Sequence, residues 1–147
     1  MPRIFGLNAV GVLISAIAFY MVGFVFYGVI FQSIWVELWN FTEAETAAMG
    51  ENATLSMAMG FVISVFSAVF IGLALKMFGT TDLNSALRKA IFLWAGFAFP
   101  TLASDSVYAG QSATLLAIDA AHLLVGFMVA AAIQTLMDGV GSKAADT

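Results

Sequence analysis

Between Ile4 and Val36 the chain carries no charged side chain. An α-helix needs about 20 consecutive apolar residues to cross the hydrocarbon core of a bilayer, so this stretch is long enough to span a membrane. Of the 147 residues, 62% are apolar and 10% are charged. A soluble domain of this length has too small a core to bury so many apolar side chains. The sequence therefore predicts a protein embedded in lipid.

Charged and turn-forming residues divide the chain into four predicted spans within one all-α, four-helix transmembrane domain, residues 1–147. The spans cover approximately residues 8–31, 54–75, 84–104 and 112–137, and residues 138–147 are predicted to form a flexible cytoplasmic tail. Asp82 is predicted to cap the start of the third span, since a side-chain oxygen there accepts from free backbone amides. Pro100 is expected to bend that span.

The basic residues predict the orientation of the bundle. Lys and Arg are retained in cytoplasmic loops, whereas acidic residues have little influence. The five basic residues all fall on one side of the predicted bundle: Arg3, Lys76, Arg88, Lys89 and Lys143. The opposite loops contain Glu37, Glu43, Glu45, Glu51 and Asp105. The sequence therefore predicts that both termini are cytoplasmic.

The segment between the first two spans has an amphipathic pattern. Ile34, Trp35, Leu38 and Trp39 share one helical face, which predicts a short helix lying at the membrane interface with Trp35 and Trp39 as anchors. Thr42 followed by Glu45 matches a capping box and predicts the start of a second short helix. The segment is interpreted as a surface anchor, with a lid or partner-docking platform as the alternative.

A row of small residues runs along the second span at every fourth position: Ser56, Gly60, Ser64, Ala68 and Gly72. We call this row the small-residue ridge. Small side chains let helix backbones approach closely in lipid, so the ridge predicts a helix-packing face. The helix that packs on the ridge is either another span of the same chain, which we favour, or a span of a second copy of the protein.

Asp119 and His122 make the fourth span chemically unusual. They stand at i and i+3, so their side chains project from one face. An ionised carboxylate at that depth costs at least about 2.5 kcal/mol, so Asp119 must be paired, protonated or hydrated, and we expect His122 to be its partner. A structural clamp is favoured over a proton relay or binding site, and haem or pigment ligation by one histidine is the weakest alternative.

Other polar side chains are expected near this pair. Trp94, Thr101 and Asp105 recur at near-helical spacing on the third span, and Tyr27 lies near the end of the first. The predicted intramembrane polar site therefore consists of Tyr27, Trp94, Thr101, Asp105, Asp119 and His122.

Several classes of function are not supported by the sequence. The chain has no cysteine, which excludes disulfides, thiolate metal sites and cysteine nucleophiles. Its net charge of −4 and scattered basic residues argue against nucleic-acid binding. No catalytic triad, phosphate loop or metalloprotease motif can be assembled, so neither an enzyme nor a metal or cofactor site is predicted.

Three short patterns resemble one known family. They are Tyr27-Gly28 with Phe31 and Trp35, then Trp94-x-Gly96-Phe97 with Thr101, then Ile118-Asp119-Ala120, and Asn8 opens the first span as that family expects. Together they resemble the bacterial four-helix inner-membrane family catalogued only as a domain of unknown function, number seventeen sixty-one, over nearly the whole chain. The sequence departs from that pattern at Phe26, where a Trp is expected, and at His122, where a Tyr is more usual. The resemblance implies a compact bacterial inner-membrane protein and brings no activity, cofactor or substrate.

These observations favour a non-catalytic multi-pass membrane protein, surrounded by lipid, that either self-associates or serves as an accessory subunit of a larger membrane complex. The alternative is a small transporter or channel with a polar route through Asp119 and His122. A lipid or cofactor binder is the third and weakest hypothesis.

Overall fold

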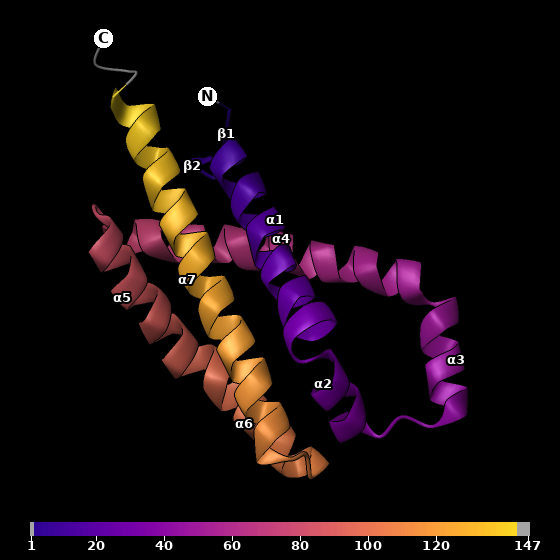
Figure 1. The fold of residues 1–147 in the computed structure, drawn as a ribbon. Coiled ribbons are helices and arrows are strands. Elements are labelled where there is room, and N and C mark those ends of the chain that lie inside the picture. The colour runs from indigo at the N-terminus through magenta and orange to yellow at the C-terminus, as the bar shows by residue number, and fades with distance from the viewer. Residues whose placement is uncertain (1, 144–147) are drawn as a thin grey trace.

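The computed structural model describes residues 2–143, and nearly all of them are helical (Figure 1). In chain order the elements are β1 (Arg3–Ile4), β2 (Leu7–Asn8), α1 (Ala9–Val25), the π-helical segment η1 (Phe26–Ile30), α2 (Gln32–Trp39), α3 (Glu43–Glu51), α4 (Ala53–Met77), α5 (Leu83–Leu93), the π-helical segment η2 (Trp94–Ala98), α6 (Phe99–Ala109) and α7 (Ala113–Lys143).

Four of the described helical stretches are long and apolar enough to cross a membrane, which confirms the predicted number of spans. They cover Ala9–Ile30, Ala53–Met77, Leu83–Ala109 and Ala113–Asp138. The third is longer than predicted, since the helix continues past Asp105 to Ala109. Residues 138–143 of the predicted tail belong to α7, and residues 144–147 lie outside the described residues.

The chain begins with a small hairpin that the hydropathy pattern did not predict. Arg3 pairs with Asn8 and Ile4 with Leu7, and the two turn residues Phe5 and Gly6 have φ values of 53° and 77°. Positive φ at both positions is the geometry of a tight hairpin turn. Asn8 then caps α1 by accepting from Val10 and Gly11, and its side-chain amide donates to the carbonyl of Met137 at 3.2 Å.

Helices α1 and α7 form an antiparallel pair in which the start of α1 lies beside the end of α7 (Figure 1). Glycines allow their close approach. A Cβ on Gly11 would lie 3.0 Å from Met137, and one on Gly126 would lie 2.9 Å from the ring of Phe19. Close packing through small residues is the usual solution in lipid, where hydrophobic exclusion no longer drives helices together.

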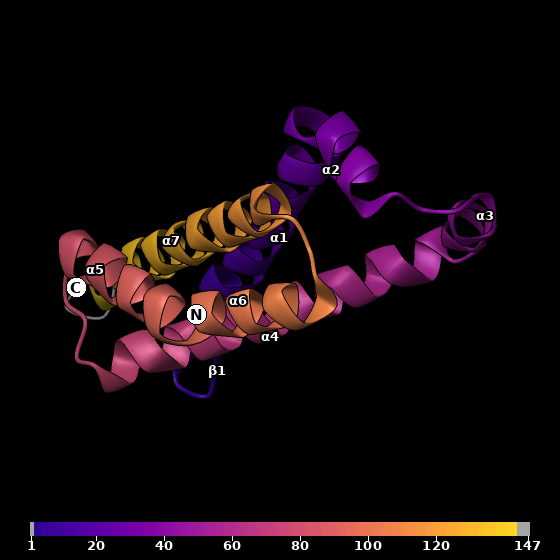
Figure 2. The same cartoon turned by 90° about the horizontal axis from the view of Figure 1, so that it is seen from below.

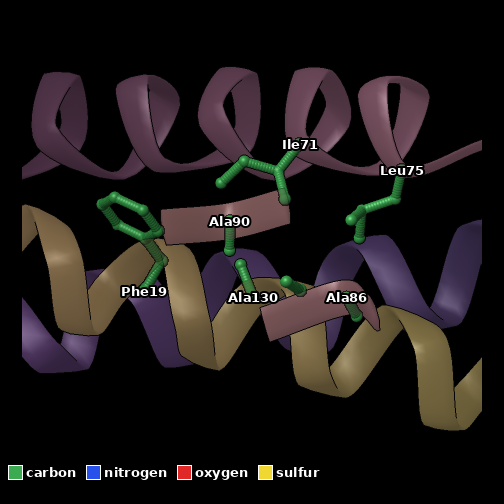
Figure 3. Close-up of a cluster of buried hydrophobic side chains, with 7 residues drawn as sticks. Phe19, Ile71, Leu75, Ala86, Ala90 and Ala130 are labelled. Atoms are coloured by element: carbon green, nitrogen blue, oxygen red, sulfur yellow. The ribbon is translucent and has the colours of Figure 1, made fainter. Parts of the chain in front are cut away.

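The main core lies where α4 and α5 pack on this pair. Figure 3 shows Ile71 and Leu75 of α4 pointing toward Ala86 and Ala90 of α5 and Ala130 of α7, with Phe19 of α1 at the edge. The three alanines are fully buried, so the contact is made largely by small side chains. In α4 the carbonyl of Ala68 also accepts a hydrogen bond of 2.7 Å from the Gln134 side chain of α7.

The small-residue ridge of α4 is covered along only part of its length. Ser64, Ala68 and Gly72 are buried, Gly60 is half-buried and Ser56 is exposed. The first part of α4, residues 53–59, is exposed throughout, and together with α3 it extends away from the other spans (Figure 2).

Two predicted caps are confirmed, and both depend on local sequence alone. The Thr42 hydroxyl and the Glu45 carboxylate form a reciprocal capping box at the start of α3. Asp82 accepts a hydrogen bond of 2.9 Å from the amide of Ser85 at the start of α5. In addition, Lys89 of α5 donates to the carbonyl of Phe78, the C-cap residue of α4, and so ties α4 to α5 across their turn.

Candidate functional site

The chemically distinctive site of the fold is a hydrogen-bonded cluster formed by Tyr27 of η1 with Asp119 and His122 of α7. The Tyr27 hydroxyl donates to Oδ1 of Asp119 at 2.7 Å, and the same oxygen lies 3.3 Å from Nδ1 of His122. All three side chains are half-buried. A polar group removed from water inside a membrane is stable only with such partners.

The hydrogen bonds of the cluster favour one arrangement of its protons. A tyrosine hydroxyl has a single hydrogen, and here it is directed at Asp119. With this hydrogen on Asp119, the imidazole tautomer that also bonds the Tyr27 oxygen donates from Nδ1 and leaves Nε2 as an acceptor. The hydrogen-bond partner of Asp119 is thus Tyr27, whereas the sequence led us to expect His122. The hydroxyl bridges the two residues.

Aromatic rings surround the imidazole. The ring centroid of His122 lies 5.0 Å from that of Tyr27, 5.9 Å from Phe26 and 6.1 Å from Phe19. Such edge-on and tilted contacts restrict the orientation of the imidazole. Trp35 of α2 extends the array, since its ring centroid lies 5.5 Å from that of Tyr27.

The predicted anchor residues Trp35 and Trp39 lie at the far end of this array. The ring of Trp39 stacks on Phe41 with an interplanar angle of 4°, and Trp35 contacts both of these rings. The segment that follows the first span is therefore connected by ring contacts to the polar cluster.

Trp94 approaches the same turn of α7 from the third span. Its indole Nε1 donates to the carbonyl of Ala120 at 2.9 Å. Trp94 begins η2 and Tyr27 lies in η1, so both π-helical segments supply a hydrogen bond to α7 between residues 119 and 122. Single π-helical turns in otherwise α-helical stretches occur frequently at functional sites.

Two residues of the predicted polar site lie apart from the cluster. Thr101 is exposed, and its hydroxyl donates at 2.7 Å to the carbonyl of Phe97 in its own span. Asp105 is also exposed and makes no hydrogen bond or ion pair with any other residue between 2 and 143. Tyr27, Trp94, Asp119 and His122 therefore form the site without them.

The cluster does not continue as a polar path along α7. The next residue on the same face, Gly126, is covered by the ring of Phe19, and beyond it lies the apolar core around Ala130. Gln134 is buried on the other side of this core. In this structure Phe19 thus separates the polar cluster from Gln134.

A groove of about 470 Å³ opens beside His122, between α1, α4 and α7. Its polar lining residues are Tyr20, Tyr27, Ser64, Ser67 and His122, and its apolar walls include Phe19, Phe24, Met57, Ile63 and Leu123. Sequence reasoning did not predict that Tyr20, Gly23 and Ser67 line one groove with His122, because no motif relates residues on three different spans.

No group of three or more metal-ligating side chains of the His, Cys, Asp or Glu type occurs among residues 2–143. The cluster contains one imidazole and one carboxylate, and Tyr27 occupies the space between them. What this arrangement can do is hold hydrogen-bond donors and acceptors in fixed positions within an apolar region.

These features define a helical protein with four candidate membrane spans and a polar cluster between the first and the fourth. The chain belongs to the family described as "Protein of unknown function (DUF1761)", whose model matches residues 10–135. The match confirms the family resemblance of the sequence patterns. No curated protein and no solved structure matches the chain.

Proposed function

We propose that this protein is a non-catalytic subunit of a membrane assembly, formed with further copies of itself or with a larger complex, in the inner membrane of a bacterium. The observation that supports this proposal is the uncovered first part of α4. Residues 53–59 are exposed on every side, and the segment leaves the bundle instead of packing along α1 (Figure 2).

The small-residue ridge gives this uncovered segment a surface for close helix packing. Its inner part, Ser64, Ala68 and Gly72, is buried within the chain, while Ser56 at its outer end is exposed. Small residues at four-residue spacing favour helix association in lipid because they allow extensive van der Waals contact. The outer part of the ridge is thus available to a second chain.

Disulfide cross-linking tests the proposal directly, because the natural chain has no cysteine. Ser56→Cys in proteoliposomes should give a cross-linked dimer or a cross-link to a co-purifying subunit. Ser104→Cys is the matched control, since Ser104 is exposed near the corresponding end of the third span. Equal cross-linking at both positions, or a protein that stays monomeric at every protein-to-lipid ratio, would contradict the proposal.

The proposed topology has both termini in the cytoplasm. Support comes from the basic residues, of which Arg3, Lys76 and Lys89 lie in the hairpin and around the α4–α5 turn. A membrane-impermeant thiol reagent applied to intact cells should label Glu45→Cys and leave Lys76→Cys unlabelled until the membrane is opened. Labelling of both before opening would exclude this topology.

The hydrogen-bonded cluster favours a second candidate function, the movement of protons or small solutes past Asp119 and His122. Such a route requires that Phe19 move away from Gly126, because its ring separates the cluster from Gln134. Flux in proteoliposomes should then fall in Asp119→Asn and rise in Phe19→Ala. Unchanged flux in both variants would remove this candidate.

A further inference from the structure

The groove beside His122 exists because α4 diverges from α1 and small residues line the space between them. Gly23, Gly28, Gly60 and Ser64 supply little side-chain volume, and α7 closes the floor with His122 and Leu123. Its volume of about 470 Å³ lies within the range of about 300–1,000 Å³ that is usual for small-molecule sites.

The polar groups that line the groove include the hydroxyls of Tyr20 and Ser67 and the imidazole of His122. Ring contacts with Phe19, Phe26 and Tyr27 restrict the orientation of this imidazole. Nε2 of His122 makes no hydrogen bond to any residue between 2 and 143. Every buried side-chain nitrogen or oxygen in that range has a partner, so an atom without one is not buried. Nε2 is therefore accessible, and the groove is the space that His122 lines. A Cβ on Gly23 would lie 3.1 Å from Nε2, so the absence of a side chain there keeps this atom open.

The chemistry of a bound molecule follows from the proton positions. When Tyr27 donates to Asp119, the tautomer of His122 that bonds Tyr27 donates from Nδ1 and accepts at Nε2. A molecule that satisfies Nε2 must therefore supply a hydrogen-bond donor. Hydroxyl groups fulfil this requirement, whereas carbonyls and ethers do not.

The depth of His122 restricts the molecule further. His122 lies nine residues after the start of α7 at Ala113, which corresponds to about 14 Å along the helix axis. The hydrocarbon core is about 30 Å thick, so with Ala113 placed at the interface His122 falls inside the hydrocarbon layer. Phospholipid headgroups stay at the interface and do not reach this level. The hydroxyl must belong to a neutral molecule that dissolves in the hydrocarbon layer.

The walls favour a flat aromatic molecule. Phe19, Tyr20, Phe24 and Tyr27 all line the groove, and aromatic rings pair well in offset or edge-on arrangements. Leu123, Ile63 and Met57 supply aliphatic surface suited to an attached chain.

We propose that this groove binds a lipid-soluble quinol or related phenol, whose hydroxyl donates a hydrogen bond to Nε2 of His122 and whose ring lies among the aromatic walls. The reduced quinol binds in preference to its oxidised quinone, because the quinone carbonyl offers Nε2 no hydrogen. This proposal does not depend on self-association, since every lining residue belongs to one chain.

The protein contains one histidine, so ¹⁵N-histidine NMR reports on this site alone. Protein in phosphatidylcholine nanodiscs is titrated with a decyl-substituted trimethylhydroquinone, with its quinone and with its dimethyl ether. We expect the hydroquinone to shift the Nε2 resonance saturably, and the quinone and ether to bind about tenfold more weakly, which corresponds to one hydrogen bond. Equal affinity for all three probes, or a linear response without saturation, would overturn the proposal.

Two variants separate the groove from general partition into lipid. Gly60→Leu fills the groove and should abolish saturable binding, because a Cβ at this position meets only Tyr20, at 3.4 Å. Gly96→Leu is the matched control on the third span, where a Cβ meets nothing within 4 Å, and it should bind as the natural chain does. The thermal midpoint of each variant shows whether it is folded.

The other possible occupants give distinct results. If a phospholipid acyl chain fills the groove, the hydroquinone will fail to displace a spin-labelled lipid from His122. If a second copy fills it, the Nε2 resonance will depend on the number of chains per nanodisc and not on the probe. Either result would also overturn the quinol proposal. A monomeric protein that binds the hydroquinone would support the quinol proposal and contradict only self-association.

Discussion

The hydroxyl of Tyr27 donates a hydrogen bond of 2.7 Å to Oδ1 of Asp119, and this contact joins the end of the first span to the fourth. The same oxygen lies 3.3 Å from Nδ1 of His122. One phenol therefore satisfies a carboxyl group and orients an imidazole. The geometry of the cluster depends on this single side chain more than on either of the two residues in α7.

Removal of the hydroxyl in Tyr27→Phe should destabilise the protein. Asp119 then loses its hydrogen-bond donor in a half-buried position, which costs about 1–3 kcal/mol. Reversible unfolding in mixed micelles measures this loss. Tyr20→Phe is the control, because the Tyr20 hydroxyl makes no hydrogen bond with residues 2–143, and it should change stability by less than about 0.5 kcal/mol. Equal losses in the two variants would contradict the assigned role of Tyr27.

The contact of Phe19 with Gly126 predicts that Gly126→Ala is destabilising. The added Cβ would lie 2.9 Å from the ring of Phe19, which is only 4% exposed. Overpacking of this kind costs about 1–3 kcal/mol, and Phe19→Leu introduced into the same chain should recover part of the loss. At Gly96, where a Cβ meets nothing within 4 Å, the change to Ala should stabilise by about 0.5–1 kcal/mol. A stabilising Gly126→Ala would show that the ring moves freely.

Gly72 and Gln134 should be energetically coupled. A Cβ on Gly72 would clash with the side-chain oxygen of Gln134, and the amide of that side chain is held by the Ala68 carbonyl at 2.7 Å. In Gly72→Ala, either the new Cβ clashes with Gln134 or the Gln134 side chain moves and its hydrogen bond to Ala68 breaks. In a double-mutant cycle, the loss of stability of Gly72→Ala/Gln134→Ala should be smaller than the sum of the losses of the two single variants by about 0.5–3 kcal/mol. Simple additivity would mean that the two residues do not share this contact.

Acidification should loosen the start of α3. The backbone and side-chain hydrogen bonds from Thr42 lower the pKa of Glu45 below its ordinary value of 4.5. Because the folded pKa is lowered, the carboxylate stabilises the cap above the ordinary pKa, and this contribution is lost as pH falls through the folded pKa. Hydrogen exchange at the Thr42 amide should therefore accelerate in this acidic range, after correction for intrinsic rates. In Glu45→Gln the acceleration should disappear, and its persistence would assign the effect to another group.

The sequence alone determined the four candidate spans and two of the helix starts. Span positions depend on the total hydropathy of about 20 consecutive residues, which neighbouring helices do not change. The caps at Thr42 and Asp82 depend on side chains that reach backbone amides three residues away. Both kinds of signal are local, so a single sequence contains them in full.

The makeup of the polar site was only partly predictable. The spacing of Trp94, Thr101 and Asp105 suggested a common face, on the assumption of a continuous α-helix. The π-helical turn Trp94–Ala98 lies between them and rotates the residues that follow by about 100°, the angle of one additional residue. Thr101 and Asp105 consequently point away from the cluster. Pro100, which was expected to bend this span, lies two residues after the turn, at the start of α6.

Only the tertiary structure decided which side chains meet across helices. Tyr27 and Asp119 are 92 positions apart, and their contact depends on how α1 and α7 cross and on the register of η1. The same is true of Phe19 against Gly126 and of the division of the small-residue ridge into a buried and an exposed part. Hydropathy predicts that a helix enters lipid, but it does not predict which helices pack together or at what crossing angle. Lipid covers every apolar face equally well, so no face is preferred. The partners are selected by close packing and by the need to satisfy each polar group, and these conditions exist only once the helices are assembled.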